Sequence, residues 1–499
     1  MAKRQYDVVI VGSGMGGATC AYSLAPSGAK ILILEKGHQI PASAVNRDER
    51  AIFQRGHFRS NEHWYDSNGS SFEAGNHYNH GGNTKFYGAV LFRYRERDFD
   101  GVAHCDGDAT AWPIRYHDLE PWYDAAEKLY QVRGQSGEDP SEPGRSQPYP
   151  HPPVPDEPAI AQVRARLKQV GLRPFSLPLA IDIDRWLSVG QTGFDAFPDA
   201  RSGKMDAETC ALLPALEYPN VEIESGAEVR RLIANQSGDR IESVEFEKDG
   251  EIRSVSAPIV VLAAGAVRSA ALLLASREGG LANRSGAVGR YFMNHNMAGV
   301  IAIDPRFVND SVYQKTFGLN DFYLSDGRGG PPLGNVQLLG RVTGTILKGT
   351  LRRIPETVLN IASRRSVAFF AMSEDFPNSD NRVKVDGRKI ILDWRPTNMA
   401  ALDCLVKRLR EKLREAGFPV VLSQLFDRRS LSHQCGTIRI GHDPASAPLD
   451  AFGRAFDVRN LFVVDASTLV TSAAVNPSLT VAALSMRTAA QIRNTELRA

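Results

Sequence analysis

Two short, continuously apolar segments near the start of the chain are separated by a segment with helical character. Residues 6–11 (YDVVIV) and 29–34 (AKILIL) are expected to be strands, because strands covered by helices on both faces show unbroken apolar runs and not alternation. Residues 18–24 between them are expected to form a helix. A strand, a helix and a second strand in this order predict a βαβ unit of Rossmann type.

Strand patterns return later in the chain. Residues 221–264 contain several strand-like segments (VEIES, AEVRRLI, RIESVEFE and APIVVLAAGA), and residues 270–275 are expected to lie in a buried helix. A last strand from Asn460 (LFVVDAS) is followed by a helix expected to begin at Pro477, since proline is favoured in the first helical turn. Residues 136–160 are rich in proline, glycine and charge, which predicts an exposed excursion or a linker.

The composition is typical of a globular protein and narrows the classes of partner. The 499 residues suggest two or three structural units, and a hydrophobic content of 42% allows a large core. The net charge of +2 and the lack of an aromatic-rich basic patch argue against nucleic acid. No segment approaches the roughly 20 apolar residues that span a bilayer, and we expect no signal peptide, because residues 1–14 run directly into a strand-like segment. We therefore expect a cytoplasmic protein without membrane insertion.

Five cysteines are scattered along the chain without a CxxC pair. This distribution predicts neither a zinc site nor a disulfide framework and favours a reducing compartment, and we expect no metal site. The cysteines are Cys20, Cys105, Cys210, Cys404 and Cys435.

A glycine-rich turn lies between the first predicted strand and helix. Gly12, Gly14 and Gly17 fit the pattern G-x-G-x-x-G. In this pattern the first glycine permits a tight turn, the second lets the backbone approach a pyrophosphate, and the third permits close helix–strand packing. Glu35, at the end of the second strand, could accept hydrogen bonds from the ribose hydroxyls of an adenine dinucleotide. The motif predicts a dinucleotide site without choosing between NAD and FAD.

Three segments near the C-terminus carry a more specific signal: HQCGTIRIG from His433, NLFVVDAS from Asn460 and NPSLT from Asn476. Together with the N-terminal motif, they closely resemble the glucose–methanol–choline (GMC) oxidoreductase family of flavoproteins. Four internal segments extend the resemblance over nearly the whole chain, namely residues 80–84, 111–127, 260–275 and 280–294. The least similar stretch is 301–429.

The resemblance implies an α/β fold, in which a Rossmann-type FAD-binding domain is joined to a discontinuous substrate domain built on an antiparallel sheet. We expect the FAD-binding domain to comprise residues 1–98, 205–300 and 430–499, and the substrate domain to comprise residues 99–204 and 301–429.

The implied cofactor is FAD, held non-covalently, because Phe86 stands where some family members carry the histidine that bonds to the flavin. Asp465 would contact the phosphate–ribityl portion of FAD, with an ordinary strand-end acid as the alternative. The helix that follows Asn476 would direct its positive end toward the flavin. The expected cofactor-binding residues are Gly12, Gly14, Gly17, Glu35, Gly82, Asn83, Thr84, Val229, Ala264, Asp465, Ala466 and Pro477.

The resemblance also assigns two catalytic positions. His433 corresponds to the histidine of the family's H-x-x-G-T motif, and Asn476 to a position that holds histidine or asparagine across the family. An imidazole, with an ordinary pKa of about 6.5, can accept the proton of an alcohol hydroxyl as hydride leaves the carbon for flavin N5. The Asn476 amide can hold the same oxygen. The other histidines near family motifs are expected to be structural: His77, His80, His295 and His442.

The substrate is less well defined by the sequence. We expect oxidation of a sugar or glycoside hydroxyl, because the layout is similar to the bacterial pyranose and glycoside oxidases of this family. The alternatives are a sterol or another lipid alcohol, an FAD-containing lyase, and a non-enzymatic FAD-binding protein. The electron acceptor, oxygen or another molecule, is open, and so is homo-oligomer formation. The aromatic and amide side chains expected to suit a sugar ring are Phe317, Phe322, Tyr323, Trp394, Asn320 and Gln337.

A basic stretch at residues 345–366 has no place in these assignments. It could form a patch for a membrane surface or a partner, but such runs are more often a solvated helix face, and this is the expectation. Its basic residues are Lys348, Arg352, Arg353, Arg364 and Arg365.

Overall fold

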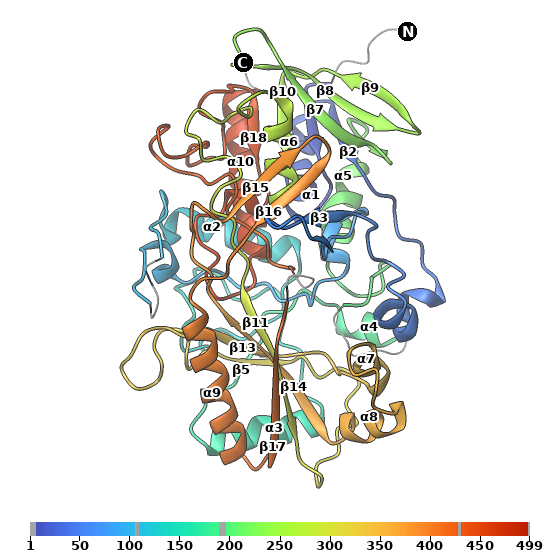
Figure 1. The fold of residues 1–499 in the computed structure, drawn as a ribbon, viewed down its shortest axis with the longest axis vertical. Coiled ribbons are helices and arrows are strands. Elements are labelled where there is room, and N and C mark those ends of the chain that lie inside the picture. The colour runs from blue at the N-terminus through green and yellow to red at the C-terminus, as the bar shows by residue number, and fades with distance from the viewer. Residues whose placement is uncertain (1–5, 105–106, 108, 189–195, 428–430, 498–499) are drawn as a thin grey trace.

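The computed structural model describes residues 6–104, 107, 109–188, 196–427 and 431–497. In Figure 1 a parallel sheet with its helices occupies the upper half, and a second sheet occupies the lower half. Cys105 lies outside the described residues. The other four cysteines are free, and three of them are buried.

Five parallel strands from separate regions of the sequence form the first sheet, in the order β18-β10-β1-β2-β6. They are β18 (Leu461–Val463), β10 (Ile259–Leu262), β1 (Val8–Val11), β2 (Ile31–Glu35) and β6 (Val221–Ser225). β1, β2 and β10 are buried at every position. The continuous apolar runs in the sequence therefore correspond to the central strands of a doubly covered sheet, and the predicted fold class is confirmed.

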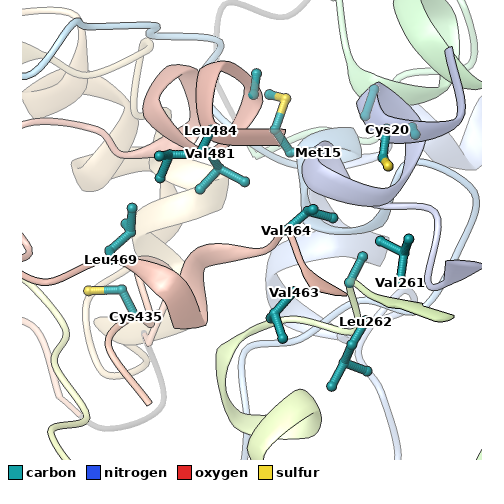
Figure 2. Packing of buried hydrophobic residues seen from close by; sticks show 14 of the residues in the cluster. Met15, Cys20, Val261, Leu262, Cys435, Val463, Val464, Leu469, Val481 and Leu484 are labelled. Atoms are coloured by element: carbon teal, nitrogen blue, oxygen red, sulfur yellow. The ribbon is translucent and has the colours of Figure 1, made fainter. Parts of the chain in front are cut away.

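Helices pack around this sheet. α1 (Met15–Leu24) lies against α10 (Ser478–Thr495), which also contacts α2 (Tyr116–Leu129). Figure 2 shows side chains of α1, β10, β18 and α10 in one core. α6 (Ala266–Ser276) packs on a three-stranded antiparallel sheet. That sheet consists of β7 (Glu228–Ala234), β8 (Ile241–Lys248) and β9 (Glu251–Val255).

The start of α1 shows why its glycines are needed. The helix begins at Met15, earlier than the predicted start at residue 18, and includes Gly16 and Gly17. Helix propensity disfavours glycine. However, a Cβ at Gly16 would lie 2.0 Å from the Val464 carbonyl oxygen, and one at Gly17 would lie 2.0 Å from the Gly12 carbonyl oxygen. Close packing on the strands therefore overrides propensity at this helix start.

The second sheet is antiparallel, in the order β17-β11-β14-β13-β12-β5. α3 (Pro158–Gln169) and α9 (Met399–Glu415) share a second hydrophobic core with one of its faces. Gln337 and Phe370, on strands β13 and β14, instead line a large cavity. The strands are β17 (Val420–Leu425), β11 (Asn296–Ile303), β14 (Ser366–Ser373), β13 (Asn335–Leu338), β12 (Phe317–Leu319) and β5 (Phe175–Ser176).

A four-stranded sheet joins segments from both predicted domains. It contains β15 (Arg382–Asp386), β16 (Lys389–Asp393), β3 (His63–Tyr65) and β4 (Ser71–Glu73). β15 packs against α6, so this part of segment 301–429 lies on the side of the parallel sheet. The remaining helices are α4 (Ile183–Ser188), α5 (Leu213–Leu216), α7 (Gly344–Thr350) and α8 (Glu356–Ser363).

The expected excursion or linker at residues 136–160 is instead a packed segment that leads into α3. Asp139 forms an ion pair with the buried Arg95 at 2.5 Å. Arg145 bonds Glu127 at 2.8 Å and lies 3.7 Å from the centre of the Tyr149 ring. The polar and charged residues that suggested a linker therefore form these contacts.

None of the helices in the described part of the chain is both long and apolar enough to cross a membrane.

Candidate active site

A cavity of about 580 Å³ is lined by residues of both large sheets. All predicted site residues line it except Gly17, whose role lies in helix packing. The predicted residues come from opposite ends of the chain, and they converge because β1, β10 and β18 are neighbours in the parallel sheet. The volume is within the usual range for a ligand site.

The glycine turn leaves room for an anionic group. Gly12 has φ +99°, a conformation that favours glycine. A Cβ on Gly14 would meet no atom within 4 Å, whereas a Cβ on Gly82 would approach the Gly14 Cα to 3.2 Å. The first turn of α1 has no side-chain cap and no acidic residue, so its N–H groups are available to an anion. These features fit the diphosphate of a dinucleotide.

Two predicted acids line the cavity but also hold the backbone. Glu35 accepts hydrogen bonds from the Ser13 N–H at 2.9 Å and from the Gly37 N–H at 2.8 Å. Asp465 accepts from the Gly265 N–H at 3.0 Å and the Ser467 N–H at 2.8 Å, and burial raises its pKa. Asp465 therefore acts as an acid at a strand end that holds the backbone, which was the alternative interpretation of this residue. It also faces the cavity.

The contact between the rings of His433 and His295 determines which nitrogen of each ring carries the proton. The Nδ1 atoms of His433 and His295 are 2.8 Å apart, and His295 Nε2 lies 3.0 Å from the carbonyl oxygens of both Ser472 and Ala473. Burial lowers the pKa of His295 to about 4, so the ring is neutral at pH 7. Carbonyl oxygens only accept, so the His295 proton is on Nε2 and its Nδ1 accepts. His433 therefore donates from Nδ1 and keeps a lone pair on Nε2.

The Asn476 side chain faces His433 and does not cap α10, which begins at Ser478 and not at the expected Pro477. Pro477 occupies the N-cap position. Asn476 Oδ1 instead accepts a hydrogen bond from Gln337 Nε2 at 3.0 Å, and its amide nitrogen lies 3.5 Å from His433 Nε2. The tertiary contact with Gln337 thus directs an amide donor and an imidazole acceptor toward each other at the cavity wall.

A chain of buried amides supports this arrangement. Gln337 Nε2 also donates to Asn335 Oδ1 at 3.2 Å, the Asn335 amide donates to Asn320 at 2.6 Å, and Asn320 donates to Asp139 at 2.8 Å. The Gln337 amide nitrogen is the donor in both of its hydrogen bonds, so the Gln337 Oε1 atom remains available as an acceptor. This buried oxygen has no hydrogen-bond partner among the described residues.

The charge environment keeps His433 neutral. Burial, the neighbouring His295 and the Lys315 ammonium together hold the pKa of His433 well below its ordinary value. The sequence-based expectation of an ordinary histidine pKa is therefore corrected. Lys315 lines the same cavity and is almost fully buried. Neither Lys315 nor the contact with His295 was assigned from the sequence, because both depend on strand order and not on a local motif.

The aromatic residues expected to stack on a sugar lie elsewhere. Phe317 and Phe322 belong to the second core, Tyr323 donates to Asp98 at 2.8 Å, and Trp394 donates to Asp375 at 2.9 Å. Hydrophobic packing holds Phe317 and Phe322 in place, and hydrogen bonds to carboxylates hold Tyr323 and Trp394. The aromatic side chains that line the cavity are Tyr78, Phe86, Tyr87 and Phe370, together with the histidines His77 and His433.

The region around Phe86 contains two further histidines. The His77 ring stacks on Phe86 with 3.7 Å between ring centres, and its Nδ1 lies 3.0 Å from the Phe58 carbonyl oxygen. His80 is directed to the Ser225 hydroxyl at 2.7 Å and is not part of the cavity wall. Within the described residues, no cluster of His, Cys, Asp and Glu could hold a metal ion.

Comparisons with known proteins identify the family and support the fold. Two models of GMC oxidoreductases match residues 176–297 and 377–485, and a model of NAD(P)-binding Rossmann-like domains matches residues 10–90. A crystal structure of pyridoxine 4-oxidase from Mesorbium loti superimposes with a TM-score of 0.67 over 99% of this chain and 100% of that chain. At 18% identity, this match shows the fold alone.

Full-length relatives are oxidases and dehydrogenases. The chain is 30% identical to 6'''-hydroxyparomomycin C oxidase of Streptomyces lividus, over 98% of this chain and 92% of the relative. It is 28% identical to paromamine 6'-oxidase of Streptomyces fradiae, over 97% and 91%. It is 27% identical to 2-methyl-1,2-propanediol dehydrogenase of Mycolicibacterium austroafricanum, over 97% and 94%. The chain is therefore an oxidoreductase that belongs to the GMC family.

Proposed function

We propose that the protein binds FAD and oxidises a hydroxyl group of a sugar or a sugar-like polyol, with His433 as the proton acceptor. The main support is the His433–His295 contact, which leaves an unprotonated Nε2 beside the Asn476 amide at the cavity wall.

FAD fits the residues that are present. The turn at Gly12 and Gly14, together with the facing Gly82, leaves the space and the N–H groups that a diphosphate needs. Glu35, at the cavity wall, would meet the adenosine ribose. Because phenylalanine forms no bond to a flavin, Phe86 supports non-covalent binding. When bound, FAD would supply the hydride acceptor.

His433 and Asn476 would act on the same alcohol oxygen. His433 Nε2 takes the hydroxyl proton while hydride leaves the carbon, and Asn476 donates a hydrogen bond that stabilises the developing negative charge. The resulting imidazolium keeps its Nδ1–H bonded to His295. Two carbonyl oxygens at His295 Nε2 in turn favour the added positive charge. His295 is thus a positioning residue, which sets the tautomer and orientation of the base.

The polar wall of the cavity favours a substrate with several hydroxyl groups. Gln337 Oε1 is an acceptor without a partner among the described residues, so a second hydroxyl of the substrate could donate to it. The names of the relatives also point to polar alcohols: 6'''-hydroxyparomomycin C, paromamine and 2-methyl-1,2-propanediol. No comparable observation favours a sterol.

Anaerobic bleaching of the flavin tests this proposal. We expect free sugars, glycosides or small diols to reduce the flavin, and sterols in detergent to fail. The His433→Ala and Asn476→Ala variants should keep FAD but react slowly, and their losses should not add fully because both side chains act on one oxygen. The His442→Ala variant, changed at an exposed histidine, is the control. Reduction by sterols alone would overturn the substrate class, and no reduction by any alcohol would favour a lyase or a non-enzymatic role.

A further inference from the structure

Helices α7 and α8, at the lower edge of the molecule in Figure 1, form a surface that the proposed reaction does not use. We call residues 344–365 the α7–α8 surface. This segment has five basic residues and one acidic residue, Glu356, which gives it a net charge of +4, whereas the whole chain carries only +2. The rest of the chain therefore carries a net charge of −2.

Most of these cations have no carboxylate partner. The single acid, Glu356, forms an ion pair with Arg50 at 3.1 Å. Lys348 Nζ donates to the carbonyl oxygens of Arg352 and Ile354 and so fixes the turn between the two helices. The guanidinium groups without an ion pair to any described residue belong to Arg352, Arg353, Arg364 and Arg365.

Aliphatic side chains are exposed among these cations. Leu351 and Ile354 in the turn are 39% and 38% exposed, and Val358 and Ile361 on α8 are 52% and 66% exposed. Leu359 is buried, so this side of α8 faces the protein. Val358, Ile361 and Arg364 follow each other at a spacing of three residues and so lie on the opposite, exposed side.

We propose that the α7–α8 surface docks the protein on an anionic lipid bilayer. The guanidinium groups would bind lipid phosphates, and the aliphatic side chains would enter the boundary of the acyl chains, as in interfacial helices. A second copy of the chain that used the same surface would place a charge of +4 against +4. The sequence led us to expect a solvated helix face. Such a face does not require the exposed apolar side chains that this surface carries.

Vesicle sedimentation of the FAD-loaded protein tests this docking. We expect binding to phosphatidylcholine–phosphatidylglycerol vesicles, little binding to pure phosphatidylcholine, and weaker binding as salt is added. Each arginine near the surface contributes about fivefold, so Arg352→Gln with Arg353→Gln should lower the affinity by roughly 25-fold. Val358→Ser with Ile361→Ser should lower it by about tenfold without a change in charge.

Matched controls use exposed residues away from this surface. Ile252→Ser and Arg328→Gln, at an exposed isoleucine and an exposed arginine, should bind vesicles like the wild type. FAD content and flavin reduction should be the same in all variants, so a failure of vesicle binding can be told apart from a failure of the proposed reaction. The proposal is overturned if anionic vesicles do not sediment the protein, or if the two aliphatic substitutions have no effect. Self-association that the same substitutions abolish, without vesicle binding, would identify a second copy as the occupant.

Discussion

Substitution of His295 tests whether a neighbouring histidine fixes the proton acceptor. The hydrogen bond from His433 Nδ1 to His295 Nδ1, at 2.8 Å, becomes a bond from a charged donor once His433 takes the substrate proton. Such bonds contribute about 1.5–3 kcal/mol, and about 1.4 kcal/mol is a tenfold change in rate. Loss of this bond should therefore slow anaerobic flavin reduction by roughly 10- to 150-fold.

Two conservative variants separate the two functions of the His295 ring. His295→Asn places a carbonyl oxygen near the Nδ1 position and retains an acceptor for His433. His295→Gln places an amide nitrogen near the Nε2 position and retains a donor for the Ser472 and Ala473 carbonyls. We expect His295→Asn to keep more of the reduction rate and His295→Gln to keep more of the resistance to urea.

Rapid-mixing measurements of flavin reduction, with urea unfolding in parallel, check these expectations. The reduction rate of each variant is compared at a substrate concentration that saturates that variant, so that a weaker affinity is not mistaken for slower chemistry. If His295→Gln reduces its flavin at the wild-type rate while His295→Asn is slow, the donor side of the ring matters and the tautomer argument fails. Wild-type rates in both variants would remove His295 from the mechanism.

Five further outcomes are expected. His433→Ala should slow flavin reduction by roughly 10²–10⁴-fold. In the wild type the rate should stay constant through neutral pH and fall only well below the ordinary histidine range, because the depressed pKa of His433 keeps the accepting, neutral form down to acid pH. Gly14→Ala should fold but bind FAD weakly, since its methyl group enters open cavity space; Gly144→Ala, at an exposed glycine outside the cavity wall, is the comparison for FAD titration. Lys85→Met should lower the free energy of unfolding in urea by about 3–5 kcal/mol, because it leaves two buried carboxylates, of Asp206 and Glu208, without their cation. Acid precipitation should release free FAD into the supernatant.

Each of these outcomes can be contradicted. A reduction rate that already falls as the pH drops from neutral to 6 would show that His433 has an ordinary pKa. Normal FAD affinity in Gly14→Ala would place the diphosphate elsewhere. An unchanged urea midpoint in Lys85→Met would show that the buried carboxyls are neutral in the folded protein. Flavin retained in the acid pellet would exclude non-covalent binding, and His77, stacked on Phe86, would then be the first residue to test.

The sequence was informative where structure follows from neighbours along the chain. The apolar runs at residues 6–11 and 29–34 correspond to β1 and β2 because burial on both faces leaves a local signature. The glycine turn was readable because Gly12 and Gly17 are needed for backbone geometry. The fold and the segments that line the cavity could therefore be predicted.

The electrostatic details of the site could not be read from the sequence. The Asn476–Pro477 pair has the local pattern of a helix cap, but a hydrogen bond from Gln337, on a strand far away in the sequence, determines where the Asn476 amide points. His295 contacts His433 only because β11 starts beside the segment that carries His433. The aromatic residues were misplaced because composition does not tell which side chains pack into a core or bond a carboxylate.

The position of β18 beside β10 has a consequence for biosynthesis. β1 and β2 leave the ribosome long before β18, Asn476 and α10, and the pairing of Leu262 with Val463 joins residues that are far apart in the sequence. Such non-local strand pairing slows folding. The wall of the cavity that carries Asn476 is thus assembled only after β18 and α10 have been translated. A nascent chain therefore cannot form the complete site, and a proteolytic cut before Leu461 would remove a sheet strand and the Asn476 amide in one event.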